Sequence, residues 1–275
     1  MDKRTGLDNN EQLHTFTSVD GTPIAFSRSG EGPPLVLLHG CGLNHHFWDL
    51  SGCQAALARQ CLVYALDRRG HGQSGDAEDY DLNREIDDVV ALTEKIGEPV
   101  ILLGHTYGAL VALEAALRID HLRGLILYEP FAFKEDGSGL QEMQETVQGD
   151  IADGDKEAAL LAVLKAMHMP NESIDELLSS TKWPEIVNEV ETLNREMNRI
   201  LAYQFDQDRF KHLKTPTLLL AGGEQPPSLF GVTETLFETL QNSRIVYLEG
   251  QNHWAMNRMM ERFIIEVVSF IRELD

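Results

Sequence analysis

The residues Gly104-His105-Thr106-Tyr107-Gly108 lie between an apolar run at 99–103 and a helical pattern at 109–117. The run before them carries no charged residue, which is typical of a strand buried on both faces of a parallel sheet. Both glycines let the strand and the helix approach closely, because a Cβ at either position would meet the neighbouring element. A strand, a tight turn and a helix in this order form a nucleophile elbow, which presents one side chain at the edge of a sheet. That side chain is Thr106.

Short apolar strands and helical patterns alternate on both sides of this elbow. A β-hairpin is predicted from 14–17 and 24–26, and further strands from 35–38, 62–66, 125–128, 217–221 and 244–248. Helices are predicted from about 45 to 57, from 82 to 96, from 229 to 241 and from the loop at 250–254 to about 273. Repeated strand and helix units predict an α/β fold with a mostly parallel central sheet flanked by helices, and ligands at the carboxyl ends of the strands.

One long stretch, 131–213, interrupts this alternation. It contains four helical patterns, near 139–148, 155–168, 172–180 and 184–205, with no β run among them. We therefore expect residues 1–130 and 214–275 to form the α/β core and residues 131–213 to form a helical cap over the same edge of the sheet. Methionines at 143, 167, 169 and 197 could line an adaptable apolar pocket there or simply pack in its core.

The charge of the chain restricts its partners. With 275 residues, 23 Lys and Arg and 44 Asp and Glu, the formal net charge is −21 and the pI is near 4.8. Such a surface repels phosphate backbones and anionic lipids, so neither nucleic acid nor membrane is expected as a partner. A small-molecule substrate is expected instead, and the sequence does not indicate an oligomeric state.

The cysteines and the apolar runs bear on the compartment. Cys41, Cys53 and Cys61 are odd in number and lack metal-type spacing. No basic and apolar leader opens the chain, and no apolar run reaches the roughly 18 residues of a membrane span. These features favour a reduced, cytoplasmic protein.

Four motifs follow one another in a recognisable order, each at a predicted strand end. They are His39-Gly40-Cys41-Gly42, the segment 67–74 (DRRGHGQS), the elbow at 104–108 and Gly250-Gln251-Asn252-His253. In this order they resemble the α/β-hydrolase superfamily, and the resemblance spans roughly residues 13–273. Members of that superfamily use a nucleophile, a general base, an acid that orients the base, and donors for an oxyanion.

The resemblance implies a role for particular residues. Thr106 stands at the nucleophile position, and His253 stands in the late loop that carries the general base. The backbone N–H groups of Cys41 and Tyr107 would receive the negative charge. The resemblance implies no cofactor and no metal.

The acid is ambiguous. Most of the superfamily carries an aspartate after the strand at 217–221, but this chain reads Gly222-Gly223-Glu224 there. A minority, including some haloalkane dehalogenases, places the acid after the strand that follows the elbow helix, where Glu129 stands. A carboxylate at the end of a buried strand can stay ionised by pairing with an imidazole. The resemblance favours Glu129 over Glu224 and leaves both open.

Threonine replaces the serine that the elbow pattern requires. Its extra methyl crowds a position whose backbone normally has a positive φ, which β-branched residues resist. Thr106 is a slower nucleophile, a residue that positions substrate or water, or the mark of a member with weak or lost activity. The aspartate nucleophile of dehalogenases and epoxide hydrolases is absent.

The leading prediction is therefore a hydrolase that cleaves a carboxylic ester, lactone or related acyl bond of a small apolar molecule. The alternatives are a catalytically weak or inactive ligand-binding member and a C–C bond hydrolase or cofactor-free oxygenase of the same fold.

Overall fold

A mostly parallel sheet forms the centre of the protein in the computed structural model, which describes residues 13–50, 52–130, 138–181, 183–223, 232–258 and 260–274. Within these residues the sheet has eight strands in the order β1-β2-β4-β3-β5-β6-β7-β8. Their bounds are β1 (Leu13–Thr17), β2 (Pro23–Ser29), β3 (Pro34–Leu38), β4 (Leu62–Leu66), β5 (Ile101–His105), β6 (Gly124–Tyr128), β7 (Thr217–Gly222) and β8 (Ser243–Leu248). The predicted α/β class and parallel sheet are confirmed.

The first two strands differ from the rest in direction. β1 pairs with β2 in antiparallel register, with Thr15 opposite Ala25, and β2 pairs antiparallel with β4. Every other neighbouring pair in the sheet is parallel. The predicted hairpin is thus confirmed, and it closes one edge of the parallel sheet.

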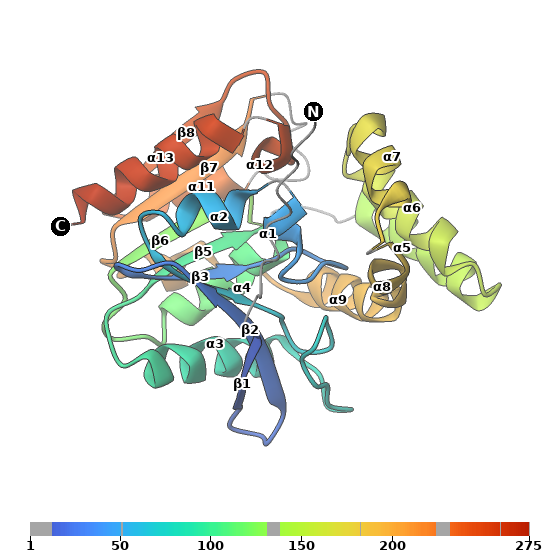
Figure 1. Ribbon diagram of the computed structural model, residues 1–275, viewed down its shortest axis with the longest axis horizontal. Helices are drawn as coiled ribbons and strands as arrows, with labels where there is room; N and C mark the ends of the chain where they lie inside the picture. The colour runs from blue at the N-terminus through green and yellow to red at the C-terminus, as the bar shows by residue number, and fades with distance from the viewer. Residues whose placement is uncertain are drawn as a thin grey trace, which may run out of the picture.

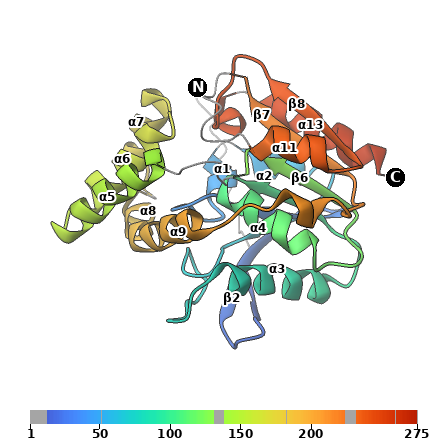
Figure 2. The same ribbon diagram turned by 180° about the vertical axis from the view of Figure 1, so that it is seen from behind.

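Helices cover both faces of the sheet (Figures 1 and 2). α2 (Cys53–Leu57) and α13 (Met260–Glu273) contact each other on one face, and α3 (Leu82–Ile96) contacts α4 (Tyr107–Ala116) on the other. The remaining elements around the sheet are α1 (Phe47–Leu50), α11 (Val232–Thr239), α12 (Ala255–Arg258) and the 3-10 helix η1 (Gln207–Phe210). β3, β5, β6 and β7 are buried along their whole length, as their continuous apolar sequences require.

One predicted helix is divided. The pattern near 45–57 predicts a single helix, but α1 ends at Leu50 and α2 begins at Cys53. Between them Gly52 adopts a φ of +72°, which a continuous right-handed helix does not allow.

The stretch between β6 and β7 is helical, as predicted, and its helices lie together on one side of the α/β body (Figures 1 and 2). They are α5 (Ser138–Ala152), α6 (Lys156–Ala166), α7 (Asn171–Ser179), α8 (Trp183–Asn188) and α9 (Val190–Ala202). The single helix predicted at 184–205 is therefore two helices, and Glu189 lies between them. The division into a core and a cap at 131–213 stays a prediction, and the N-terminal residues 1–11 lie outside the described residues.

Candidate active site

The turn between β5 and α4 has the geometry of a nucleophile elbow. Thr106 adopts φ 52° and ψ −114°, a combination that is uncommon for a non-glycine residue. A Cβ on Gly104 would lie 2.4 Å from the Gly108 oxygen, and a Cβ on Gly108 would lie 2.3 Å from the Leu38 oxygen. Both glycines are thus required by close contact, and the backbone N–H of Thr106 donates to the Tyr128 oxygen at 2.9 Å. The surrounding elements hold the Thr106 backbone in this strained conformation.

The two branches of the Thr106 side chain have different surroundings. A Cβ on Gly40 would lie 2.2 Å from the Thr106 methyl carbon, so this methyl packs directly on the glycine of the His39-Gly40 pair. The Thr106 hydroxyl is buried and has no hydrogen-bond partner in the part of the chain that the structure describes. No hydrogen bond therefore joins Thr106 to His253 here, although both residues line one pocket. Catalytic hydrogen bonds are often long before substrate binds, so this separation does not exclude a reaction.

His253 is paired with Glu129. The imidazole Nδ1 donates to Glu129 Oε2, and the backbone N–H of Gly222 donates to Glu129 Oε1 at 2.6 Å. Glu129 follows β6 directly, with a φ of +46°, and its side chain is almost completely buried. Glu224, the other candidate acid, lies outside the described residues. The structure places Glu129 against the imidazole.

Burial sets the ionisation of this pair. It lowers the pKa of His253 to about 3, so the imidazole is neutral at neutral pH. Burial also raises the pKa of Glu129 to about 8, and the Gly222 N–H opposes that increase. A buried carboxyl that gains its charge near neutral pH is typical of groups that take part in acid and base chemistry.

Aromatic rings fix the orientation of the His253 imidazole. Its ring centroid lies 4.3 Å from that of His105, and the Trp254 ring packs against it edge-on at 5.4 Å. His105 Nε2 donates to the His253 carbonyl oxygen at 3.0 Å. His105 thus holds the loop that carries the base.

The pocket shared by Thr106 and His253 is small and apolar. It encloses about 30 Å³, room for about two water molecules. From the α/β body it is lined by Cys41, Leu43, Thr106, His253 and Trp254. From the helices between β6 and β7 it is lined by leucines and a valine and by Met143, Met167 and Met197, whereas Met169 is not among the lining residues. The helices α5, α6 and α9 therefore supply side chains to the wall of this pocket.

The predicted oxyanion donors lie on two sides of Thr106. Tyr107 is the first residue of α4, where backbone N–H groups have no acceptor within the helix. Cys41 lines the pocket from the loop after β3. Burial raises the pKa of the Cys41 thiol well above its usual range, and Glu196 raises it further, so the side chain stays protonated and is a poor nucleophile.

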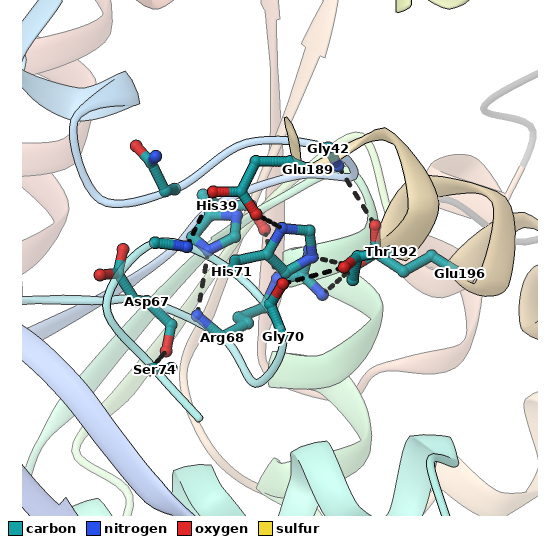
Figure 3. A network of polar contacts seen from close by, with 12 residues as sticks. His39, Gly42, Asp67, Arg68, Gly70, His71, Ser74, Glu189, Thr192 and Glu196 are labelled. Atoms are coloured by element: carbon teal, nitrogen blue, oxygen red, sulfur yellow. Dashed lines mark hydrogen bonds and ion pairs between the residues drawn. The ribbon is translucent and has the colours of Figure 1, made fainter. Parts of the chain in front are cut away.

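Behind this loop lies a buried polar network that the sequence did not predict (Figure 3). Arg68 donates to Glu85 at 2.8 Å and to Glu196 of α9 at 2.5 Å, and all three side chains are almost inaccessible to solvent. His71 donates to Glu189 and to Glu196, both at 3.0 Å. Within the segment 67–74, Asp67 holds the turn by accepting from Gln73 N at 2.9 Å, whereas Arg68 and His71 reach other elements.

His45 forms a second buried contact with the segment 67–74. Its ring Nδ1 donates to Asp67 at 2.6 Å, and the residue is buried. This contact ties the start of α1 to the end of β4. Over the residues that the structure describes, no group of three or more His, Cys, Asp or Glu side chains could hold a metal ion. Nor is any helix in the described part of the chain long and apolar enough to cross a membrane.

An eight-stranded, mostly parallel sheet with an elbow after β5 and a histidine after β8 defines the class of α/β-hydrolase folds. The model of the alpha/beta hydrolase family matches residues 35–266, and the chain belongs to that family.

Solved structures of similar shape include hydrolases and esterases. An alpha/beta hydrolase from Sphaerobacter thermophilus DSM 20745 is 28% identical, with a TM-score of 0.77, and the match covers 92% of this chain and 99% of that chain. An esterase from Rhodococcus sp. ECU1013 is 26% identical with a TM-score of 0.77, and the match covers 96% and 99% of the two chains.

Curated relatives match over different lengths. Uncharacterized proteins from Mycobacterium bovis and Mycobacterium tuberculosis are 35% identical over 109 residues, which is 39% of this chain and only 31% of theirs. A pimeloyl-[acyl-carrier protein] methyl ester esterase from Aliivibrio fischeri is 24% identical over 92% of this chain and 98% of its own.

Proposed function

We propose that the protein is an esterase that hydrolyses a carboxylic ester with a short, apolar acyl group. The observation that carries the proposal is that a neutral imidazole, bound to the Glu129 carboxyl, and a hydroxyl at the elbow line one apolar pocket. The similarity to an esterase from Rhodococcus and to a methyl ester esterase from Aliivibrio fischeri supports the same class of reaction. Among the described residues the lining holds no Asp, Glu, Lys or Arg, which favours an uncharged acyl group.

In the proposed reaction Thr106 attacks the ester carbonyl through its hydroxyl oxygen, and His253 takes the proton. Glu129 holds the imidazole through Nδ1, so the other ring nitrogen receives that proton. The Cys41 and Tyr107 amides donate to the carbonyl oxygen as it becomes negative. His253 then protonates the departing alcohol, and a water molecule, activated by the same imidazole, releases the acid and restores Thr106.

Substitution of Thr106 tests the covalent step. Thr106→Ser removes the methyl that packs on Gly40 and relieves the β-branched strain at φ 52°, so turnover of p-nitrophenyl acetate should rise. Thr106→Ala should abolish turnover, and a fluorophosphonate probe should add one adduct, located at Thr106 by mass spectrometry. Equal turnover in all three proteins would exclude covalent catalysis at this residue. The pocket further predicts that acetyl and propionyl esters react faster than octanoyl esters.

The second candidate is a ligand-binding member that has lost the reaction. The unpartnered Thr106 hydroxyl favours it, since the imidazole does not yet activate that group. Thermal stabilisation by small apolar ligands, with no ester turnover and no fluorophosphonate adduct, would identify this function.

A further inference from the structure

The loop that carries Cys41 is held at both of its peptide groups. Arg68 Nη2 donates to the Gly40 oxygen at 2.9 Å, and Arg68 Nε donates to the His39 oxygen at 3.0 Å. The next peptide group is held as well, because the Gly42 N–H donates to Glu196 Oε2 at 3.2 Å. Cys41 therefore lies between two fixed peptide planes.

Because the peptide bond is planar, the contact between Arg68 and the Gly40 oxygen also fixes the direction of the Cys41 N–H. The Gly40 oxygen and the Cys41 N–H belong to the same trans peptide group, in which they point in opposite directions. When Arg68 holds that oxygen behind the loop, the N–H must point the opposite way. A rotation of this peptide would turn the Cys41 N–H away from the pocket, and the same rotation would break the hydrogen bond between Arg68 and the Gly40 oxygen.

Arg68 is itself held by carboxylates. Its guanidinium lies 4.9 Å from the centre of the Tyr107 ring and donates to Glu85 and Glu196. Burial raises the pKa of Glu196, but Arg68 and His71 outweigh that effect and lower it to about 2, so the carboxylate remains charged. The contacts to Gly42 and to Arg68 use different oxygens of Glu196, which join the two fixed peptides into one unit (Figure 3).

Glu196 comes from α9, the helix that also supplies part of the pocket wall. Leu193 is one turn before it and Met197 directly follows it, and both line the pocket. The helix that contacts the acyl group thus also carries the carboxylate that fixes the Cys41 loop.

We propose that Arg68 and Glu196 are positioning residues that aim the Cys41 amide at the carbonyl oxygen of the substrate, with α9 supplying the anchor. This inference rests on the proposed ester hydrolysis. Neither residue lines the pocket, so each acts through the Cys41 loop.

Two charge-matched pairs of variants test this role on the full-length protein with p-nitrophenyl acetate. Glu196→Gln removes the anchor charge, and its control is Glu191→Gln on the exposed side of the same helix, where Glu191 binds Lys156. Arg68→Lys keeps the charge but loses the planar guanidinium, whose N–H groups donate to the His39 and Gly40 oxygens. Its control is Arg84→Lys on α3, which pairs with Asp79 near the surface.

Both test variants should lower kcat about 10- to 100-fold, because a misaimed oxyanion donor retains only part of its effect. KM should stay within about 3-fold, because the apolar lining is unchanged. The two controls should keep the wild-type values. Test variants that match their controls in kcat, or that change KM alone, would overturn the positioning role while ester hydrolysis stands.

Hydrogen exchange of the Gly42 amide gives a second test, which does not depend on catalysis and which the wild-type protein alone can contradict. In the wild-type protein its hydrogen exchange, followed by NMR, should be slow, because its acceptor is a fully buried carboxylate. In Glu196→Gln it should exchange at least about 10-fold faster than in Glu191→Gln. Rapid Gly42 exchange in the wild type would overturn the inference even if the variants do not fold. A wild-type protein that hydrolyses no ester overturns the proposed function instead, and the oxyanion role falls with it.

Discussion

Two buried groups of histidine and carboxyl side chains lie at or near the elbow pocket, and their charges differ. At Glu129 and His253 burial dominates, so the pKa of the imidazole falls to about 3 and the pKa of the carboxyl rises to about 8. In the network of His71 and Glu196 the neighbouring charges dominate. There the pKa of the imidazole rises to about 9 and that of the carboxyl falls to about 2, although burial acts in the opposite direction on both.

The charges around each imidazole explain the difference. Each ring nitrogen of His71 faces a carboxylate oxygen at 3.0 Å, so both nitrogens must carry a proton. His253 meets the Glu129 carboxyl at Nδ1, and burial lowers the pKa of its imidazole. A buried imidazole that stays neutral can act as a base, whereas a histidine between two carboxylates is a fixed cation that holds structure. The predictions below separate these two behaviours.

The largest effect is expected at His253. His253→Ala should lower kcat for p-nitrophenyl acetate by about 10⁴-fold, the upper end of general base catalysis, because no other described imidazole lines the pocket with Thr106. His121→Ala, at an exposed position, is the matched control and should leave kcat unchanged. A loss below about 10-fold would mean that the paired imidazole is not the base.

Glu129→Gln should lower kcat by about 10²-fold, as expected when a base loses its orienting partner. In the wild type kcat/KM should rise as pH approaches about 8, because the carboxyl gains its charge over that range. The variant should lack this rise in its pH profile. Glu224→Gln is the control, and a larger loss there than in Glu129→Gln would transfer the acid role to Glu224.

His71 is expected to act on stability through pH. Its pKa is 6.5 when unfolded and about 9 when folded, so its stabilising effect is complete below pH 6.5 and is lost as pH rises through 9. The change corresponds to about 3 kcal/mol in the free energy of unfolding. Urea titrations between pH 6 and 10 should show a decline in the wild type that exceeds the decline in His71→Gln by that amount. Parallel curves would mean that His71 is not a buried cation.

The sequence predicts the fold well because the signals of the fold are local. The apolar run of β3, the capped amphipathic pattern of α3 and the glycines at 104 and 108 each determine structure within a few residues. Motif order also predicts which residues gather at the pocket, and Glu129 is found against His253.

The sequence could not predict the second cluster. His71 and Glu196 are 125 residues apart, and their contact depends on how α9 packs on the α/β body. A glutamate on an amphipathic helix is usually solvated, and the pattern around residue 196 does not distinguish a buried glutamate from a solvated one. The break between α1 and α2 was missed for a different reason, since only the left-handed backbone of Gly52 marks it.

The smallest effect is expected next to Glu196 on the same helix. Arg195 donates to both oxygens of Asp76 at 2.7 and 3.0 Å, which gives α9 a second tie to the loop that carries His71. This pair is partly exposed, with 28% and 44% of the two side chains accessible, so water and salt weaken it. Arg195→Gln should therefore lower the free energy of unfolding by about 0.5–1 kcal/mol, and 1 M NaCl should remove most of that difference. Glu196→Gln removes the buried carboxylate that Arg68 and His71 share and should cost about 3–5 kcal/mol in any salt. Urea titrations of both variants in low and high salt measure the contrast. Equal losses would mean that the buried network contributes no more than a surface ion pair, and α9 would then be held by its apolar face alone.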